Sequence, residues 1–170
     1  TEPLKSRTGQ PLTPSNNYFV GRVKKDVLSQ SYVGGVMTSR DSTIAGDFNR
    51  VYGADAYFQF NRRLEFDSYI LKSDSPDSKR TGSKLQDSQA RKFATTWRDD
   101  EWVLAAEYNT IQKNFRPDVG FVRRGDATNY SADVAWNPLL ENNDTIKNLR
   151  FSGSLDYFAN SASNKVETDR

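Results

Sequence analysis

Cysteine and histidine are both absent from this chain of 170 residues, and methionine occurs once. Without cysteine there can be no disulfide, thiolate metal site or cysteine nucleophile. Without histidine, the serine–histidine and cysteine–histidine catalytic arrangements and most zinc sites are excluded as well. We therefore predict no metal and no cofactor. Enzymatic activity would have to come from carboxylates, and we expect a protein that is not an enzyme.

Long apolar runs are absent too. The two longest uncharged runs, from Thr8 to Gly21 and from Val27 to Ser39, both contain polar residues and glycines and are shorter than the roughly 20 apolar residues of a membrane helix. Hydrophobic residues make up 35% of the chain, below the usual globular share of roughly 45–50%. A membrane helix is therefore excluded, and a large dry core is not expected.

A strong charge of one sign is also missing, because 24 basic residues are balanced by 22 acidic ones and the two kinds alternate along the chain. Without a basic face we predict no nucleic-acid partner. Aromatic residues are frequent, at 12%, although the mean hydropathy is only −0.80. Rings in so polar a chain indicate surfaces or interfaces as well as a core.

From Asn17 onward, apolar and polar residues alternate with period two in eight successive segments separated by turn residues. The clearest segment runs from Arg50 to Phe60. This pattern predicts an all-β fold, an antiparallel up-and-down sheet of about eight strands that forms a segment of a transmembrane-type β-barrel. Residues 17–160 would form the barrel segment, residues 1–16 an irregular lead-in or loop, and residues 161–170 a polar loop or tail.

The expected connectors alternate between short and long. Ser29-Gln30, Asn61–Arg63 and Asp99–Glu101 are short, whereas residues 41–49, 73–89 and 112–127 are long; the last connector, residues 137–148, is longer than the alternation predicts. Outer-membrane barrels place short turns on the periplasmic side and long loops outside. The sequence therefore predicts a location in a bacterial outer membrane, as in Gram-negative-type bacteria, with membrane lipid as a partner.

Aromatic residues fall beside both kinds of connector, with small residues such as Ala54 and Ala106 between them. Membrane barrels carry rings at both water–lipid boundaries. The residues that we expect in these two aromatic girdles are Tyr52, Phe60, Phe93, Trp97, Trp102, Tyr108, Tyr130 and Trp136.

The opposite face of the strands is charged, and in a barrel it would line a wet lumen. The expected lumen charges are Arg22, Lys24, Asp26, Asp55, Glu107, Asp133, Arg150 and Asp156. The acidic ones could in principle form a glycosidase pair, but no motif supports catalysis.

Periodicity alone does not tell the inside of a sheet from its outside. The alternative is therefore a soluble β-sandwich or barrel domain that binds or hydrolyses carbohydrate. That alternative predicts a dry core made by Phe58, Leu64, Trp102 and Val134.

The run from Phe115 to Asp126 is the best candidate for a ligand-binding or loop-structuring site, because Pro117 and Gly120 fix a turn in it. Its charged residues are Asp118, Arg123, Arg124 and Asp126. The arginine pair could clamp a carboxylate, phosphate or sugar, or it could tie the loop to lumen carboxylates. We favour the structural role.

Several segments resemble a known family: Arg22-Val23-Lys24-Lys25-Asp26, Tyr32-Val33-Gly34-Gly35, residues 49–55 (NRVYGAD) and, most specifically, residues 114–124 (NFRPDVGFVRR). The family is a domain-of-unknown-function family of predicted outer-membrane barrels that usually follows a family-9-type carbohydrate-binding-like domain. The likeness extends from Asn17 to Tyr157. It implies a segment of a longer barrel, with further strands as partners, in a glycan-associated surface or transport protein. It assigns no biochemical activity.

Overall fold

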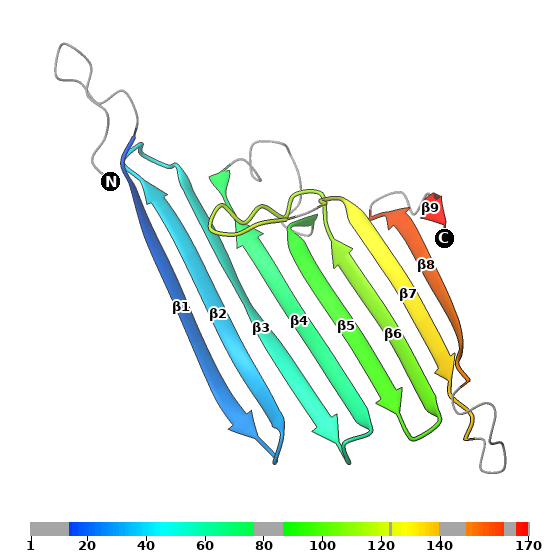
Figure 1. The fold of residues 1–170 in the computed structure, drawn as a ribbon. Coiled ribbons are helices and arrows are strands. Elements are labelled where there is room, and N and C mark those ends of the chain that lie inside the picture. The colour runs from blue at the N-terminus through cyan, green and yellow to red at the C-terminus, as the bar shows by residue number, and fades with distance from the viewer. Residues whose placement is uncertain (1–13, 77–86, 123, 140–148, 162–165, 170) are drawn as a thin grey trace.

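The computed structural model describes residues 14–76, 87–122, 124–139, 149–161 and 166–169. They form one nine-stranded sheet in which every strand pairs antiparallel with its neighbour along the chain, in the order β1 to β9 (Figure 1). The strands are β1 (Asn16–Val27), β2 (Ser31–Ser42), β3 (Phe48–Phe60), β4 (Leu64–Asp74), β5 (Gln89–Arg98), β6 (Trp102–Ile111), β7 (Ala127–Trp136), β8 (Phe151–Asn160) and β9 (Val166–Asp169). The predicted all-β, antiparallel up-and-down architecture is confirmed.

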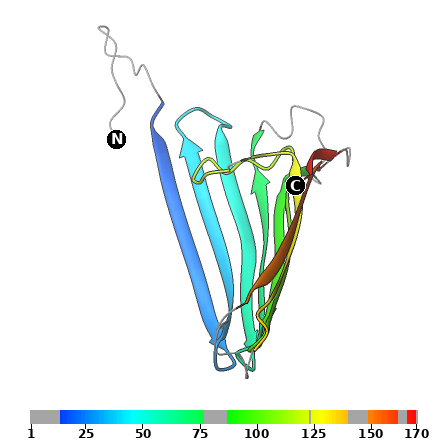
Figure 2. The same cartoon turned by 45° about the vertical axis from the view of Figure 1, so that its right-hand side comes forward.

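The sheet is open, because among the described residues β1 pairs only with β2 and β9 only with β8. Figure 2 shows a single curved layer without a second sheet packed against it. Trp102 and Val134, which the soluble alternative places in a dry core, are 38% and 42% exposed. The described part of the chain therefore lacks the second layer that a sandwich requires.

Local sequence explains the short turns. Asn61 and Arg62 both have positive φ (49° and 55°), a conformation that asparagine tolerates well, and the Arg63 amide donates to the Phe60 carbonyl. At the next short turn, the Asp99 carboxylate accepts hydrogen bonds from the amides of Glu101 and Trp102. Both turns therefore return the chain directly into the neighbouring strand.

Two boundaries differ from the sequence prediction. The connector expected at residues 41–49 is shorter, since Asp41 pairs with Phe48 and continues the ladder between β2 and β3. Residues 161–170 were expected to form a polar loop or tail, but Val166–Asp169 form β9 on the edge of β8. Backbone pairing needs no apolar side-chain pattern, so period-two analysis does not detect such a strand.

Because side chains alternate along a strand, the cross-strand register assigns every residue to one of two faces. We call the side that carries Ala54, Phe93, Ala106, Tyr130 and Trp136 the apolar face. The opposite side, with Arg22, Asp55, Lys92, Glu107 and Asp133, is the polar face. The alternation read from the sequence thus predicted the two faces.

Candidate functional site: a loop docked on the polar face

Ion pairs connect strands across the polar face. Arg22 of β1 pairs with Asp55 of β3, and the Lys92 Nζ of β5 lies 2.8 Å from the Asp67 Oδ2 of β4. Lys92 also lies 3.9 Å from Glu107 of β6. Single exposed ion pairs contribute little to stability. Here they link side chains of β1 with β3 and of β4, β5 and β6 across the polar face.

Gly34 makes the pair between Arg22 and Asp55 possible. It lies on β2 between the two partners, paired with Lys24 and Asp55. A Cβ atom at Gly34 would lie 2.8 Å from the Asp55 Oδ1, which is closer than real Cβ contacts allow. The missing side chain therefore lets the Asp55 carboxylate extend across β2 to the Arg22 guanidinium.

The structure brings the expected lumen charges to one face. Seven of them lie on polar-face positions of the strands, and Arg150 lies just before β8, beside Asp133 at a shallow hollow. The Lys24 ammonium stacks 3.6 Å from the centre of the Tyr32 ring. The positions are Arg22, Lys24, Asp26, Asp55, Glu107, Asp133, Arg150 and Asp156.

The connector between β6 and β7 does not extend away from the sheet but crosses over the end of β5, β4 and β3 (Figure 1). Phe115, near its start, is only 9% exposed and belongs to a cluster with Val51 and Ala90 on the polar face. Leu71 and Ile111 pack against the same cluster. The polar face therefore contains an apolar patch, which we call the loop seat: Val51, Tyr69, Leu71, Ala90 and Ile111.

The side chain of Asn49 binds the backbone of the loop. Its side chain, 1% exposed, donates to the Arg116 carbonyl (2.7 Å) and accepts from the Asp118 amide (3.1 Å). The Arg116 amide in turn donates to the Ser73 Oγ at 3.0 Å. Buried backbone groups need such partners, so these three hydrogen bonds determine where the loop can lie.

An ion-pair cluster completes the docking at β2. The Arg40 Nε donates to the Asp118 Oδ2 at 2.9 Å, while its other nitrogens donate to Asp47 and Asn16. The hydrogen bond from Arg40, opposed by partial desolvation, lowers the pKa of Asp47 below its ordinary value. Asp47 therefore stays ionised through the neutral range, and Arg40 links two connectors.

The remaining charged residues of the predicted loop site are not gathered at the seat. Asp126 has a φ of 55° and accepts hydrogen bonds from the Asn160 Nδ2 (3.0 Å) and from Ser161, so it structures the end of the loop beside β8. Arg124 is exposed. Arg123 lies outside the described residues. Asp118 and Asp126 are thus held by hydrogen bonds at two separate places, Asp118 by Arg40 and Asp126 beside β8.

Sequence reasoning missed the loop seat. By strand alternation the charged face includes the positions of Val51, Leu71, Ala90 and Ile111. The one sequence feature that could have revealed this apolar patch is a local break in the alternation. Apolar residues stand next to each other in Val51-Tyr52 and Ile70-Leu71, which breaks the alternation at the ends of β3 and β4 next to the long connectors.

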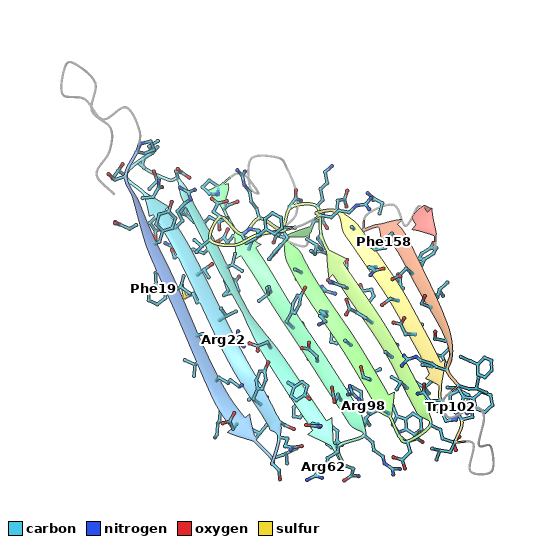
Figure 3. The ribbon with its side chains drawn as sticks, viewed as in Figure 1. Phe19, Arg22, Arg62, Arg98, Trp102 and Phe158 are labelled. Carbon is cyan, nitrogen blue, oxygen red and sulfur yellow. The ribbon has the colours of Figure 1, made fainter. Side chains whose placement is uncertain are left out.

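The apolar face carries rows of stacked rings. Phe93, Tyr108 and Tyr130 follow one another across β5, β6 and β7, with ring centres 6.3 Å and 5.2 Å apart. Trp102, labelled in Figure 3, lies near the short turn between β5 and β6. Its ring stacks on that of Trp136, with the ring centres 5.7 Å apart. The eight girdle residues all lie on this face: Tyr52, Phe60, Phe93, Trp97, Trp102, Tyr108, Tyr130 and Trp136.

Within the described residues, no helix is long and apolar enough to cross a membrane, and no three acidic side chains gather in a way that could hold a metal ion. The fold and the docked loop define an amphipathic antiparallel sheet with one polar face partly covered by its own connector. Comparison with protein-family models, with curated proteins and with solved structures finds no match for the chain in any of the three.

Replacing Asn49 by alanine is expected to release the loop. The Arg116 carbonyl and the Asp118 amide would lose a buried partner, which costs about 1–3 kcal/mol and raises the undocked fraction roughly 5- to 100-fold. Trypsin should then cut faster after Lys113, whereas the bond after Arg116 precedes proline and resists it. Limited proteolysis of the folded full-length product measures the rate.

The matched control is Asn129→Ala on β7, whose side-chain oxygen accepts no hydrogen bond within the described structure. It should leave cleavage after Lys113 unchanged. Equal cleavage of the Asn49→Ala variant and the native protein would show that Asn49 does not hold the loop.

Proposed function

We propose that this chain is a segment of the wall of an outer-membrane β-barrel, with its apolar face toward lipid and its polar face toward a water-filled lumen. The observation that carries the proposal is an apolar face that nothing covers within the described residues. Sixteen of its large hydrophobic side chains are exposed, distributed over β1 to β8. Exposed apolar surface on this scale marks an interaction with lipid or another apolar partner.

Strand length and ring placement favour lipid as that partner. β5, β6, β7 and β8 each have 10 residues, within the roughly 9–11 that a tilted strand needs to cross a bilayer. Ala106 and Ala132 lie between the ring rows at Tyr108–Tyr130 and Trp102–Trp136. This order of rings, small residues and rings fits an outer-membrane wall.

The open edges at β1 and β9 would pair with further strands of a longer barrel, because an unpaired strand edge cannot face hydrocarbon. The docked loop would then narrow the lumen from its long-connector end, and the protein would provide a passage or a surface platform. Association with a glycan stays a prediction of the family resemblance, and the polar face suggests no catalytic role.

The full-length product tests this proposal. We expect it in the sarkosyl-insoluble outer-membrane fraction, and we expect its mobility on gels to change on heating, because closed barrels resist unfolding by detergent until heated. Isolation as a freely soluble monomer that folds without detergent would refute the membrane assignment and favour the soluble carbohydrate-binding alternative.

A further inference from the structure

Basic side chains gather at one end of the apolar face. Arg50 of β3, Lys72 of β4 and Arg91 of β5 lie on that face near the long connectors. Lys72 pairs with Gln89 and Arg91 pairs with Ile70 in the register. Lys72 and Arg91 are therefore diagonal neighbours, with backbone positions roughly 7–8 Å apart.

Two of these cations form no ion pair within the described part of the chain. Arg50 lies 3.3 Å from Asp41, whereas Lys72 and Arg91 form no ion pair with any described residue. The Arg91 Nε donates to the Gln89 Oε1 at 2.8 Å, and this neutral amide orients the guanidinium without cancelling its charge. Lys72 and Arg91 thus place two positive charges on a mostly apolar face, whose carboxylates at the same end are Asp41 and Asp74.

A hollow of about 960 Å³ leads away from these charges along the apolar face. Lys72 and Gln89 line one end of it, and Tyr52, Ile70 and Gly35 line its course. A Cβ atom at Gly35 would find no atom nearer than the Gly53 carbonyl oxygen at 3.8 Å, so the hollow is open above this glycine.

We propose that Lys72, Arg91 and the adjoining hollow form a binding site for a phosphorylated lipid of the outer leaflet. The phosphate would bind between the two cations, and an acyl chain would lie in the hollow. The inference rests on the proposed barrel, because it requires the apolar face to contact lipid and the long connectors to face outward. Clustered basic residues at the headgroup level are the usual recognition element for anionic lipids.

Charge and shape together favour a lipid over an acidic protein segment. The cations adjoin an apolar hollow. A ligand that contacts both must therefore be anionic at one end and apolar along the rest of its length. Arginine also binds phosphate through two parallel hydrogen bonds, which the orientation by Gln89 prepares.

The test titrates the full-length product in detergent with bisphosphorylated lipid A, with the same lipid after removal of its phosphates, and with inorganic phosphate, using native mass spectrometry. The variants are Lys72→Gln, Arg91→Gln and the double variant. The control is Lys25→Gln, since Lys25 lies on the same face of β1 but near a short turn. We expect the affinity for the phosphorylated lipid to fall roughly fivefold in each single variant and roughly thirtyfold in the double variant. The affinity of the Lys25→Gln control should not change.

Gly35→Leu is a second probe, because a side chain there would fill the hollow. It should weaken binding of the lipid and leave the weak binding of inorganic phosphate as it was. Any of three results would overturn the proposed site. The first is equal affinity for the dephosphorylated and the phosphorylated lipid, the second is a loss of affinity in Lys25→Gln as large as that in the Lys72 and Arg91 variants, and the third is inorganic phosphate that binds as tightly as the lipid. Heat-modifiable mobility in the same samples would show that the barrel assignment survives such a result.

Discussion

In the proposed barrel, replacing Ala106 by lysine is expected to prevent assembly, whereas the same replacement at the neighbouring Ala105 is expected to be tolerated. Ala106 lies on the apolar face of β6, between Thr95 and Ala132 on the adjacent strands. A lysine on the lipid side near the bilayer midplane costs about 2–4 kcal/mol. Against a total stability of about 5–15 kcal/mol, such a loss is severe.

Ala105 provides the matched control because it is the preceding residue of the same strand and has the same side chain. It lies on the polar face between Thr96 and Asp133. A lysine there would be hydrated and would find a carboxylate opposite. The two variants therefore differ only in the face that carries the new charge.

Heat-modifiable mobility and recovery in the outer-membrane fraction measure both variants in the full-length product. The chain contains no cysteine, so Ala105→Cys and Ala106→Cys add a direct readout. A membrane-impermeant maleimide should label the Ala105→Cys variant from the water-filled lumen and leave the Ala106→Cys variant unmodified. Equal labelling of the two variants, together with assembly of Ala106→Lys, would show that the apolar face does not contact lipid.

The faces of the sheet could be predicted from the sequence because a strand alternates strictly, so that each residue from Arg50 to Phe60 has its side determined by position alone. The pairing of Phe93 with Tyr108 follows from the short turn between β5 and β6, which fixes the register, whereas Tyr130 joins this row across the long connector between β6 and β7. Local information suffices for the faces and for the pairing across the short turn. It does not suffice for the open or closed state of the sheet, since closure depends on which strand meets the edge of β1.

The loop seat could not be predicted in the same way, because its parts are far apart in the sequence. Asn49 and Asp118 are in contact across 69 residues of chain, and neither belongs to a recognisable motif. The sequence did indicate that residues 115–126 form a structured loop. No local pattern indicated that Phe115 would pack against Val51 and Ala90 on the polar face. The charged residues of the loop, such as Arg123 and Arg124, were the more evident candidates for a site.

Only a few interactions hold this loop on the sheet. Phe115 is the buried loop residue of the apolar cluster, and Asn49, Ser73 and Arg40 supply hydrogen bonds. Burial of one aromatic side chain contributes about 1.5–3 kcal/mol, and each hydrogen bond adds about 0.5–1.5 kcal/mol. The loop can therefore be released by a single substitution without loss of the strands beneath it.

Phe115→Ala is accordingly expected to undock the loop and, in the proposed barrel, to widen the lumen. Loss of a buried phenylalanine costs about 3–5 kcal/mol, which shifts the docking equilibrium by roughly a hundredfold or more. In planar bilayers the full-length variant should conduct more than the native protein, with an unchanged heat-modifiable mobility that shows an intact barrel. Phe115→Leu should restore part of the docking and conduct at an intermediate level.

Phe121→Ala is the control from the same loop, because Phe121 is 88% exposed and contributes little to the seat. It should conduct like the native protein. If Phe115→Ala exposes Lys113 to trypsin but leaves the conductance unchanged, the loop docks as described and does not restrict passage. Any constriction of the proposed barrel would then have to lie elsewhere, and the ion pairs of Arg22 and Lys92 on the polar face would be the next positions to vary.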